Sequence, residues 1–171
     1  MRRMNLKKGV ILLTKETAPV LVEIDIQNAG DFLCEVSHTQ IRYWATTTLL
    51  NEGIEAEMTV RLVDESESTY LNETYRHGCG PTNVLSFEFN EKQNTALRLI
   101  GDVVICVPVV QGEAVAQGKT LDAHWAHMVV HGTLHLLGYK HESEAEAERM
   151  ELLETAIMRK LGFSDPYYAN I

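Results

Sequence analysis

The segment from His131 to His141 constrains this chain more than any other, because its three histidines stand four and six residues apart. Histidines four residues apart lie about one turn apart on the same face of a helix, so His131 and His135 can reach one ion. Gly138 lets the helix end and the chain turn back, which predicts that His141 approaches that ion from outside the helix. Three nitrogen ligands leave a fourth position for water, which is typical of a catalytic zinc. The alternative is that His131 and His135 are hydrogen-bonded helix residues that hold no metal.

Length and composition predict one compact domain. Of the 171 residues, 45% are hydrophobic, so enough surface can be buried without disulfides. The three cysteines are odd in number and lack a C-x-x-C spacing, which indicates free thiols in a reducing cytoplasm. The longest apolar run, residues 103–110, is too short to span a membrane. Residues 1–18 are predicted to form a loose N-terminal arm, and residues 19–171 the domain.

The charge of the chain is acidic, with a formal net charge of −9. This negative net charge argues against broad, non-specific binding of nucleic acid, although it does not exclude a small basic cleft. Much of the negative charge lies in residues 142–154, among periodically spaced apolar residues, which predicts an amphipathic helix with a solvated acidic face. One of these glutamates could alternatively act as the general base beside the metal, with Glu142 closest in sequence to a ligand.

Hydrophobic periodicity predicts an α+β fold, in which a small, roughly four-stranded sheet is covered by about five helices in a mixed α/β arrangement. The predicted strands are residues 20–26, 58–63, 85–89 and 103–107. The last of these is apolar on both faces and is therefore predicted to be central. Helices are expected after three N-cap residues, Ser37, Asp64 and Thr120, and also over residues 109–117. The histidine helix resembles the metal helix of the zincins.

Several motifs together resemble one known family. Residues 131–141 resemble the H-G-x-L-H-L-x-G-Y-D-H signature of the YbeY family of endoribonucleases and ribosomal RNA maturation factors. Tyr75-Arg76 followed by P-T-N-V-L-S-F at residues 81–87 resembles a second family segment, and residues 60–64 and Gly101-Asp102 are similar in order and position. The resemblance extends from about residue 21 to residue 168.

One position departs from the family signature, because Lys140 stands where the family has an aspartate. If that aspartate orients His141 or a bound water, its loss would weaken metal binding or alter the pH response. Alternatively, Lys140 helps to bind phosphate, or it simply points to solvent.

The resemblance implies a metal-dependent hydrolase domain that acts as a single-strand-specific endoribonuclease in rRNA processing. Family members act in 16S rRNA 3′-end maturation and ribosome quality control, in the cytoplasm. The expected partners are single-stranded RNA or rRNA, the small ribosomal subunit and an assembly GTPase, with no membrane and no DNA. One zinc ion per chain is expected, with nickel or another divalent ion as the alternative.

The candidate site residues divide by role. His131, His135 and His141 are the predicted metal ligands, and His131 is also assigned a catalytic role through the metal. The resemblance implies that Arg61 stabilises charge on the reacting phosphate. Arg76 is a second candidate for phosphate contact, with a surface salt bridge as the alternative. His127 lines the substrate channel or is a histidine near the helix start with a polar partner.

Two other functions remain open. Zincin-type metallopeptidases carry H-E-x-x-H-x-x-G-x-x-H, whose glutamate takes the proton from metal-bound water. Gly132 occupies that position here, so the peptidase mechanism lacks its base. A non-catalytic, metal-binding ribosome assembly factor is the third hypothesis.

Overall fold

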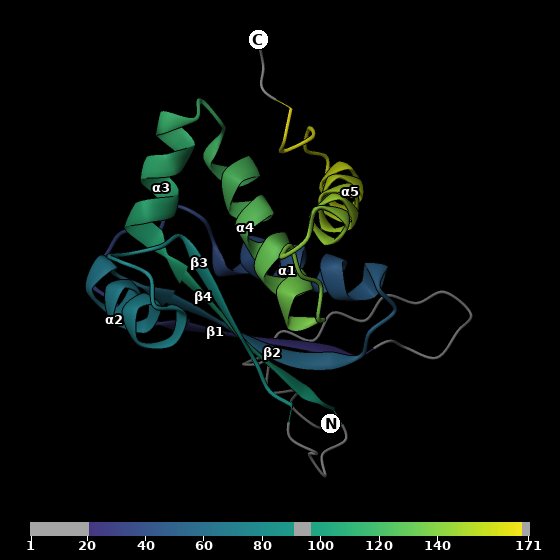
Figure 1. The fold of residues 1–171 in the computed structure, drawn as a ribbon, viewed down its shortest axis with the longest axis horizontal. Coiled ribbons are helices and arrows are strands. Elements are labelled where there is room, and N and C mark those ends of the chain that lie inside the picture. Colours follow the sequence, from purple (N-terminus) through teal and green to yellow (C-terminus); the bar gives the residue numbers. More distant parts are fainter. Residues whose placement is uncertain (1–20, 91–96, 169–171) are drawn as a thin grey trace, which may run out of the picture.

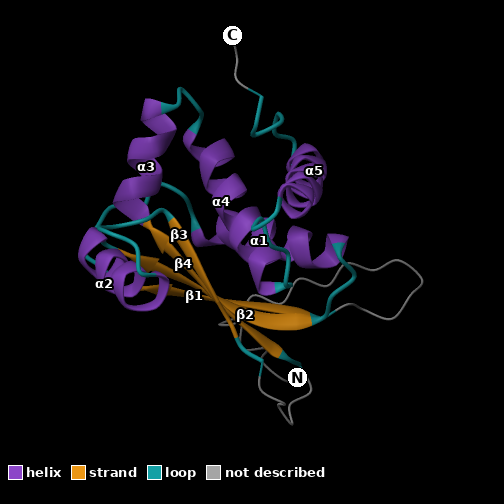
Figure 2. Cartoon of the chain, viewed as in Figure 1, coloured by secondary structure: helices purple, strands orange, loops and turns teal. Residues whose placement is uncertain are grey.

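A four-stranded sheet forms the centre of the computed structural model, which describes residues 21–90 and 97–168 (Figures 1 and 2). The strands are, in chain order, β1 (Val22–Asn28), β2 (Ala56–Val63), β3 (Val84–Glu88) and β4 (Leu99–Cys106). Their order in the sheet is β1-β2-β4-β3; β1, β2 and β4 are parallel, and β3 runs antiparallel to β4 at the edge. The prediction of a central strand at residues 103–107 is confirmed, although the strand begins earlier, at Leu99.

Strand β1 begins at Val22, after the described residue Leu21, and continues to Asn28, beyond the predicted end at residue 26; residue 20 lies outside the described residues. The predicted N-terminal arm, residues 1–18, also lies outside the described residues. No helix in the described part of the chain is long and apolar enough to cross a bilayer.

The described helices are, in chain order, α1 (His38–Asn51), α2 (Glu65–Arg76), α3 (Val107–Ala116), α4 (Leu121–Leu136) and α5 (Glu144–Lys160). Their N-termini follow the predicted capping residues. Ser37, Asp64 and Thr120 each accept a hydrogen bond from the backbone N–H three residues later, which satisfies a donor that the helix leaves free. Helix α3 starts before the expected residue 109, because Pro108 is tolerated in a first helical turn.

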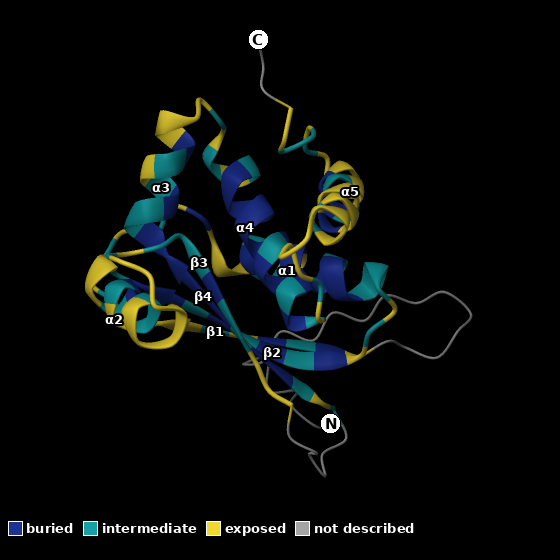
Figure 3. Ribbon diagram, viewed as in Figure 1, coloured by how far each residue is buried: buried dark blue, intermediate teal, exposed yellow. Residues whose placement is uncertain are grey.

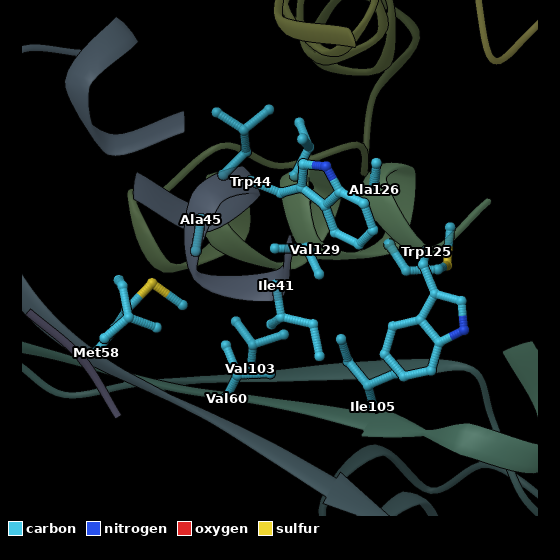
Figure 4. Packing of buried hydrophobic residues seen from close by; sticks show 14 of the residues in the cluster. Ile41, Trp44, Ala45, Met58, Val60, Val103, Ile105, Trp125, Ala126 and Val129 are labelled. Atoms are coloured by element: carbon cyan, nitrogen blue, oxygen red, sulfur yellow. The ribbon is translucent and has the colours of Figure 1, made fainter. Parts of the chain in front are cut away.

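The helices cover both faces of the sheet (Figure 1). Helices α1, α3 and α4 lie over one face, with α5 outside α4, and α2 lies on the opposite face. The main core lies between α1, α4 and the sheet, where Ile41, Trp125 and Val129 meet Val103 and Ile105 (Figure 4). A second, smaller core beneath α2 contains Val63, Leu85, Val104 and Cys106.

Helix α4 is buried along most of its length, as Figure 3 shows. Gly132 lets it approach the sheet closely, because a Cβ at this position would lie only 2.6 Å from Val103 Cγ1 and 3.1 Å from Val84 Cγ2. Ser86 of β3 also donates a hydrogen bond of 2.9 Å to the Gly132 carbonyl. The last turns of α4 are thereby held against the edge strand of the sheet.

Candidate metal centre

Three histidines meet where α4 ends. One ring nitrogen from each of His131, His135 and His141 lies within 4.8 Å of the others; these residues are called the three-histidine cluster below. His131 and His135 come from successive turns of α4. After the helix, Gly138 adopts a positive φ of 90°, and the chain turns so that the His141 ring centroid lies 4.8 Å from that of His135.

Hydrogen bonds fix which nitrogens of the cluster carry lone pairs. His135 Nδ1 lies 2.8 Å from the Tyr139 carbonyl oxygen, and His131 Nδ1 lies 2.6 Å from Glu154 Oε1. Both oxygens are acceptors, so each Nδ1 carries a hydrogen, and in the neutral ring each Nε2 presents a lone pair. The two Nε2 atoms face each other at 3.0 Å. Two lone pairs this close are stabilised by a cation between them, so the donor set fits a divalent metal.

The protonation state of His135 also suits a ligand. Burial, and then the neighbouring His131, lower its pKa from 6.5 to about 4. The imidazole is therefore neutral at physiological pH and free to bind a metal.

The three-histidine cluster opens into a cleft of about 510 Å³. Its lining includes two cations, Arg76 and Lys140, and two carboxylates, Glu88 and Glu142. The remaining lining residues besides the histidines come from the stretch leading into β3 and from β3 itself: Asn83, Val84, Leu85 and Ser86. Lys140, the position that departs from the family signature, is thus exposed beside the cluster and available to an anionic ligand.

Arg76, the last residue of α2, is held at the cleft by neighbours on β3. Its Nη2 donates to the Ser86 carbonyl, and its guanidinium carbon lies 5.6 Å from the centroid of the Phe87 ring. Neither contact is the surface salt bridge considered from the sequence. Because a guanidinium has five N–H donors, Arg76 retains donors for a phosphate.

Arg61 lies on the face of the sheet opposite α4. Its neighbours Val60 and Leu62 are buried in the main core, so the Arg61 side chain lies on the face that α2 covers. Its Nε donates to Glu67 Oε1 at 2.7 Å, and its Nη1 donates to Gln27 Oε1 at 3.1 Å. Arg61 does not line the cleft described above, and its action on phosphate stays a prediction.

His127 lies one turn before His131 and is 8% exposed. Its Nε2 lies 3.3 Å from both Tyr167 Oη and Glu154 Oε1, so it has the polar partner considered from the sequence. His127 is likewise not among the residues that line the cleft, and its contact with substrate stays a prediction.

Glu154 is the residue that sequence reasoning missed. The acidic residues of α5 were expected on a solvated face, but Glu154 is 0% exposed, because that side of α5 packs on α4. Burial alone would raise its pKa, yet hydrogen bonds and charge from His127 and His131 lower the pKa to about 2. Its spacing from buried Met150 and Ile157 is the signal that could have placed it on the inner face.

The fold and the site together define an α+β protein whose three-histidine cluster suits a divalent metal and opens into a cleft edged by two cations. The model of the family described as Endoribonuclease YbeY matches residues 25–162, so the chain belongs to the YbeY endoribonuclease family. This membership supports an endoribonuclease role in rRNA processing. The solution structure of TM1509 from Thermotoga maritima has a similar fold, with a TM-score of 0.52 and 23% sequence identity over 85% of this chain and 99% of that one.

Proposed function

We propose that this protein is a metal-dependent, single-strand-specific endoribonuclease that processes ribosomal RNA. The observation that carries the proposal is the three-histidine cluster at the cleft, with Arg76 and Lys140 beside it. A metal bound there would polarise a phosphoryl oxygen and activate a water. Zinc is the ion we expect, with nickel or another divalent ion as the alternative, since imidazole nitrogens suit several of them.

The residues around the cluster divide the remaining work. Arg76 and Lys140 would position the phosphate and stabilise the charge that grows on it. Glu142 and Glu88 both line the cleft, and we propose that Glu142, which follows His141, takes a proton from the attacking water. A cleft of about 510 Å³ accepts an unpaired strand with splayed bases more readily than an A-form duplex.

The peptidase alternative receives no support from the site. The position of the peptidase glutamate is Gly132, which packs against Val103 and Val84 in the core. A glutamate there would meet the sheet, so α4 would have to move before the carboxylate could reach the metal.

The biological role follows the family resemblance. We place this activity in 16S rRNA 3′-end maturation and ribosome quality control in the cytoplasm, with the small ribosomal subunit and an assembly GTPase as partners. Co-sedimentation of the protein with purified small ribosomal subunits tests whether that subunit is a partner. The non-catalytic assembly factor predicts the same association without any cleavage.

The test of the activity compares three substrates at measured metal content: an unstructured RNA, the same RNA annealed to its complement, and casein. His135→Ala removes one ligand, and His38→Ala, at an exposed position at the start of α1, is the matched control. We expect cleavage of the unpaired RNA alone, its loss together with the metal in His135→Ala, and no change in His38→Ala. RNA cleavage that survives in metal-free His135→Ala would contradict the proposal, and casein cleavage that is lost with the metal would favour a peptidase.

A further inference from the structure

We propose that Glu154 and Tyr167 are positioning residues that tune the metal affinity of the three-histidine cluster through His131. Tyr167 holds Glu154, and Glu154 in turn holds the imidazole of His131 with its Nε2 toward the other two histidines. This inference rests on the proposed function only in requiring that the cluster binds a metal.

The first step is the contact between Glu154 and His131. Glu154 Oε1 lies 2.6 Å from His131 Nδ1, and the carboxylate is 0% exposed. Its bond fixes both the tautomer and the ring orientation of His131, which leaves Nε2 for the metal. A carboxylate behind a metal-binding histidine also makes the imidazole a stronger ligand.

The second step concerns the charge of Glu154. A buried carboxylate is costly unless it is paired, and the partners that the structure describes for Glu154 are His131, His127 and the Tyr167 hydroxyl. Each can donate a hydrogen bond without carrying a permanent positive charge. A divalent cation held on the far side of the His131 ring would supply a favourable charge, so metal binding and the burial of Glu154 support each other.

The third step is the role of Tyr167. Its hydroxyl donates to Glu154 Oε2 and its ring centroid lies 5.2 Å from that of His127, edge to face. The backbone N–H of Tyr167 donates to Asp165 Oδ1 at 2.9 Å, and Thr155 Oγ1 donates to the same oxygen at 3.3 Å. These bonds hold the chain after α5 against that helix. Two hydrogen bonds in series, from Tyr167 to Glu154 and from His131 to Glu154, then connect this segment to the three-histidine cluster.

His127, His131 and Glu154 could themselves be taken for a second metal site, since one ligand atom from each lies within 4.8 Å of the others. The hydrogen bond between His131 and Glu154 already occupies His131 Nδ1, however. His127 and Glu154 are both buried, and neither lines the cleft. We therefore assign these residues to the support of the cluster, not to a second ion.

The test measures the Kd for Zn²⁺ alone, by competition with a chromogenic chelator, on the metal-free full-length protein. The variants are Glu154→Gln and Tyr167→Phe. Their matched controls are Glu151→Gln, at an exposed position of the same helix, and Tyr168→Phe, at a neighbouring tyrosine that is 73% exposed. We expect the Kd to rise about 10- to 100-fold in Glu154→Gln, the usual effect of losing such a partner. We expect a smaller rise in Tyr167→Phe and none in the controls.

Further readouts separate positioning from structural damage. Loss of a hydrogen bond to buried Glu154 should lower the thermal midpoint of metal-free Tyr167→Phe by a few degrees. Its circular dichroism spectrum at the temperature of the Kd measurement should still match that of the wild type, so that a rise in its Kd reports on the metal site itself. The absorption spectrum of the Co²⁺-loaded protein should change in Glu154→Gln, because the orientation of His131 changes. The double variant should weaken binding by less than the product of the two single effects, because both act through one carboxylate.

The outcomes distinguish this inference from the proposed function. If His131→Ala binds Zn²⁺ as tightly as the wild type, the assignment of the three-histidine cluster as the metal centre is overturned. If His131→Ala loses the metal while Glu154→Gln and Tyr167→Phe keep the wild-type Kd and Co²⁺ spectrum, only the positioning role is overturned. Should Glu154→Gln fail to fold, Tyr167→Phe decides the question alone.

Discussion

The Nε2 atoms of His131 and His135 face each other at 3.0 Å, while the Nδ1 atom of each ring is committed to an oxygen acceptor. A bound cation would stabilise this arrangement, whereas in the metal-free protein the lone pairs of the two Nε2 atoms repel each other. Protons compete for the same nitrogens, so both the stability of the metal-free protein and its capacity for metal should depend on pH.

The metal-free protein should lose stability as the pH falls. His135 has a pKa of about 4 in the folded state against an ordinary 6.5, so the unfolded chain binds its proton first and the free energy of unfolding decreases from pH 6.5 to 4. Glu154, with a folded pKa of about 2 against 4.5, extends the loss from pH 4.5 downwards. Urea denaturation at each pH measures this. His135→Ala should show a smaller change between pH 6.5 and 4, and an unchanged slope in that variant would contradict the assignment.

Gly132→Ala should destabilise the protein, because the new Cβ would lie 2.6 Å from Val103 Cγ1 on a buried strand. Overpacking of this kind costs about 1–3 kcal/mol. The matched control is Gly112→Ala in α3, where a Cβ would meet no atom within 4 Å and should stabilise the helix by about 0.5–1 kcal/mol. Denaturant midpoints check both values. The Val103→Ala change should relieve part of the Gly132→Ala defect, and fully additive effects would argue against the contact.

Arg76→Ala should lower RNA cleavage about 100-fold with the metal content unchanged, since it removes a donor for the phosphate charge at the cleft. Arg61→Ala provides the comparison, because Arg61 pairs with Glu67 and is not among the residues that line the cleft. From this placement we expect Arg61→Ala to change kcat/KM less than Arg76→Ala. A larger loss in Arg61→Ala, with the fold intact, would return the phosphate role to Arg61, as the family resemblance implies.

Lys140→Asp restores the residue of the family signature and should weaken the binding of RNA. The logarithm of the binding constant falls as the logarithm of the salt concentration rises. Removing one cation that contacts phosphate makes this slope less steep by about 1. Arg159→Asp, at an exposed position in the last turn of α5, makes the same change of charge away from the cleft. Fluorescence anisotropy with a labelled, unstructured RNA at several salt concentrations measures the slope. Equal effects in the two variants would show that only the net charge matters and that Lys140 has no local contact.

Short-range patterns in the sequence determined most of the local structure. The caps at Ser37, Asp64 and Thr120 were predictable because an N-cap bonds to a backbone group only three residues away. The convergence of the three histidines was predictable for the same reason, since helical spacing and one turn at Gly138 suffice to bring them together.

The tertiary structure alone decided which side of the molecule the more distant residues face. Alternation along β2 places Arg61 opposite Val60, but only the packing of the helices shows that the Arg61 side chain lies on the α2 side of the sheet, paired with Glu67. Likewise, Glu154 belongs by composition to an acidic surface, yet the docking of α5 on α4 buries it behind His131. Such pairings join residues far apart in sequence, and the free energy of packing and desolvation that selects them is a property of the whole fold.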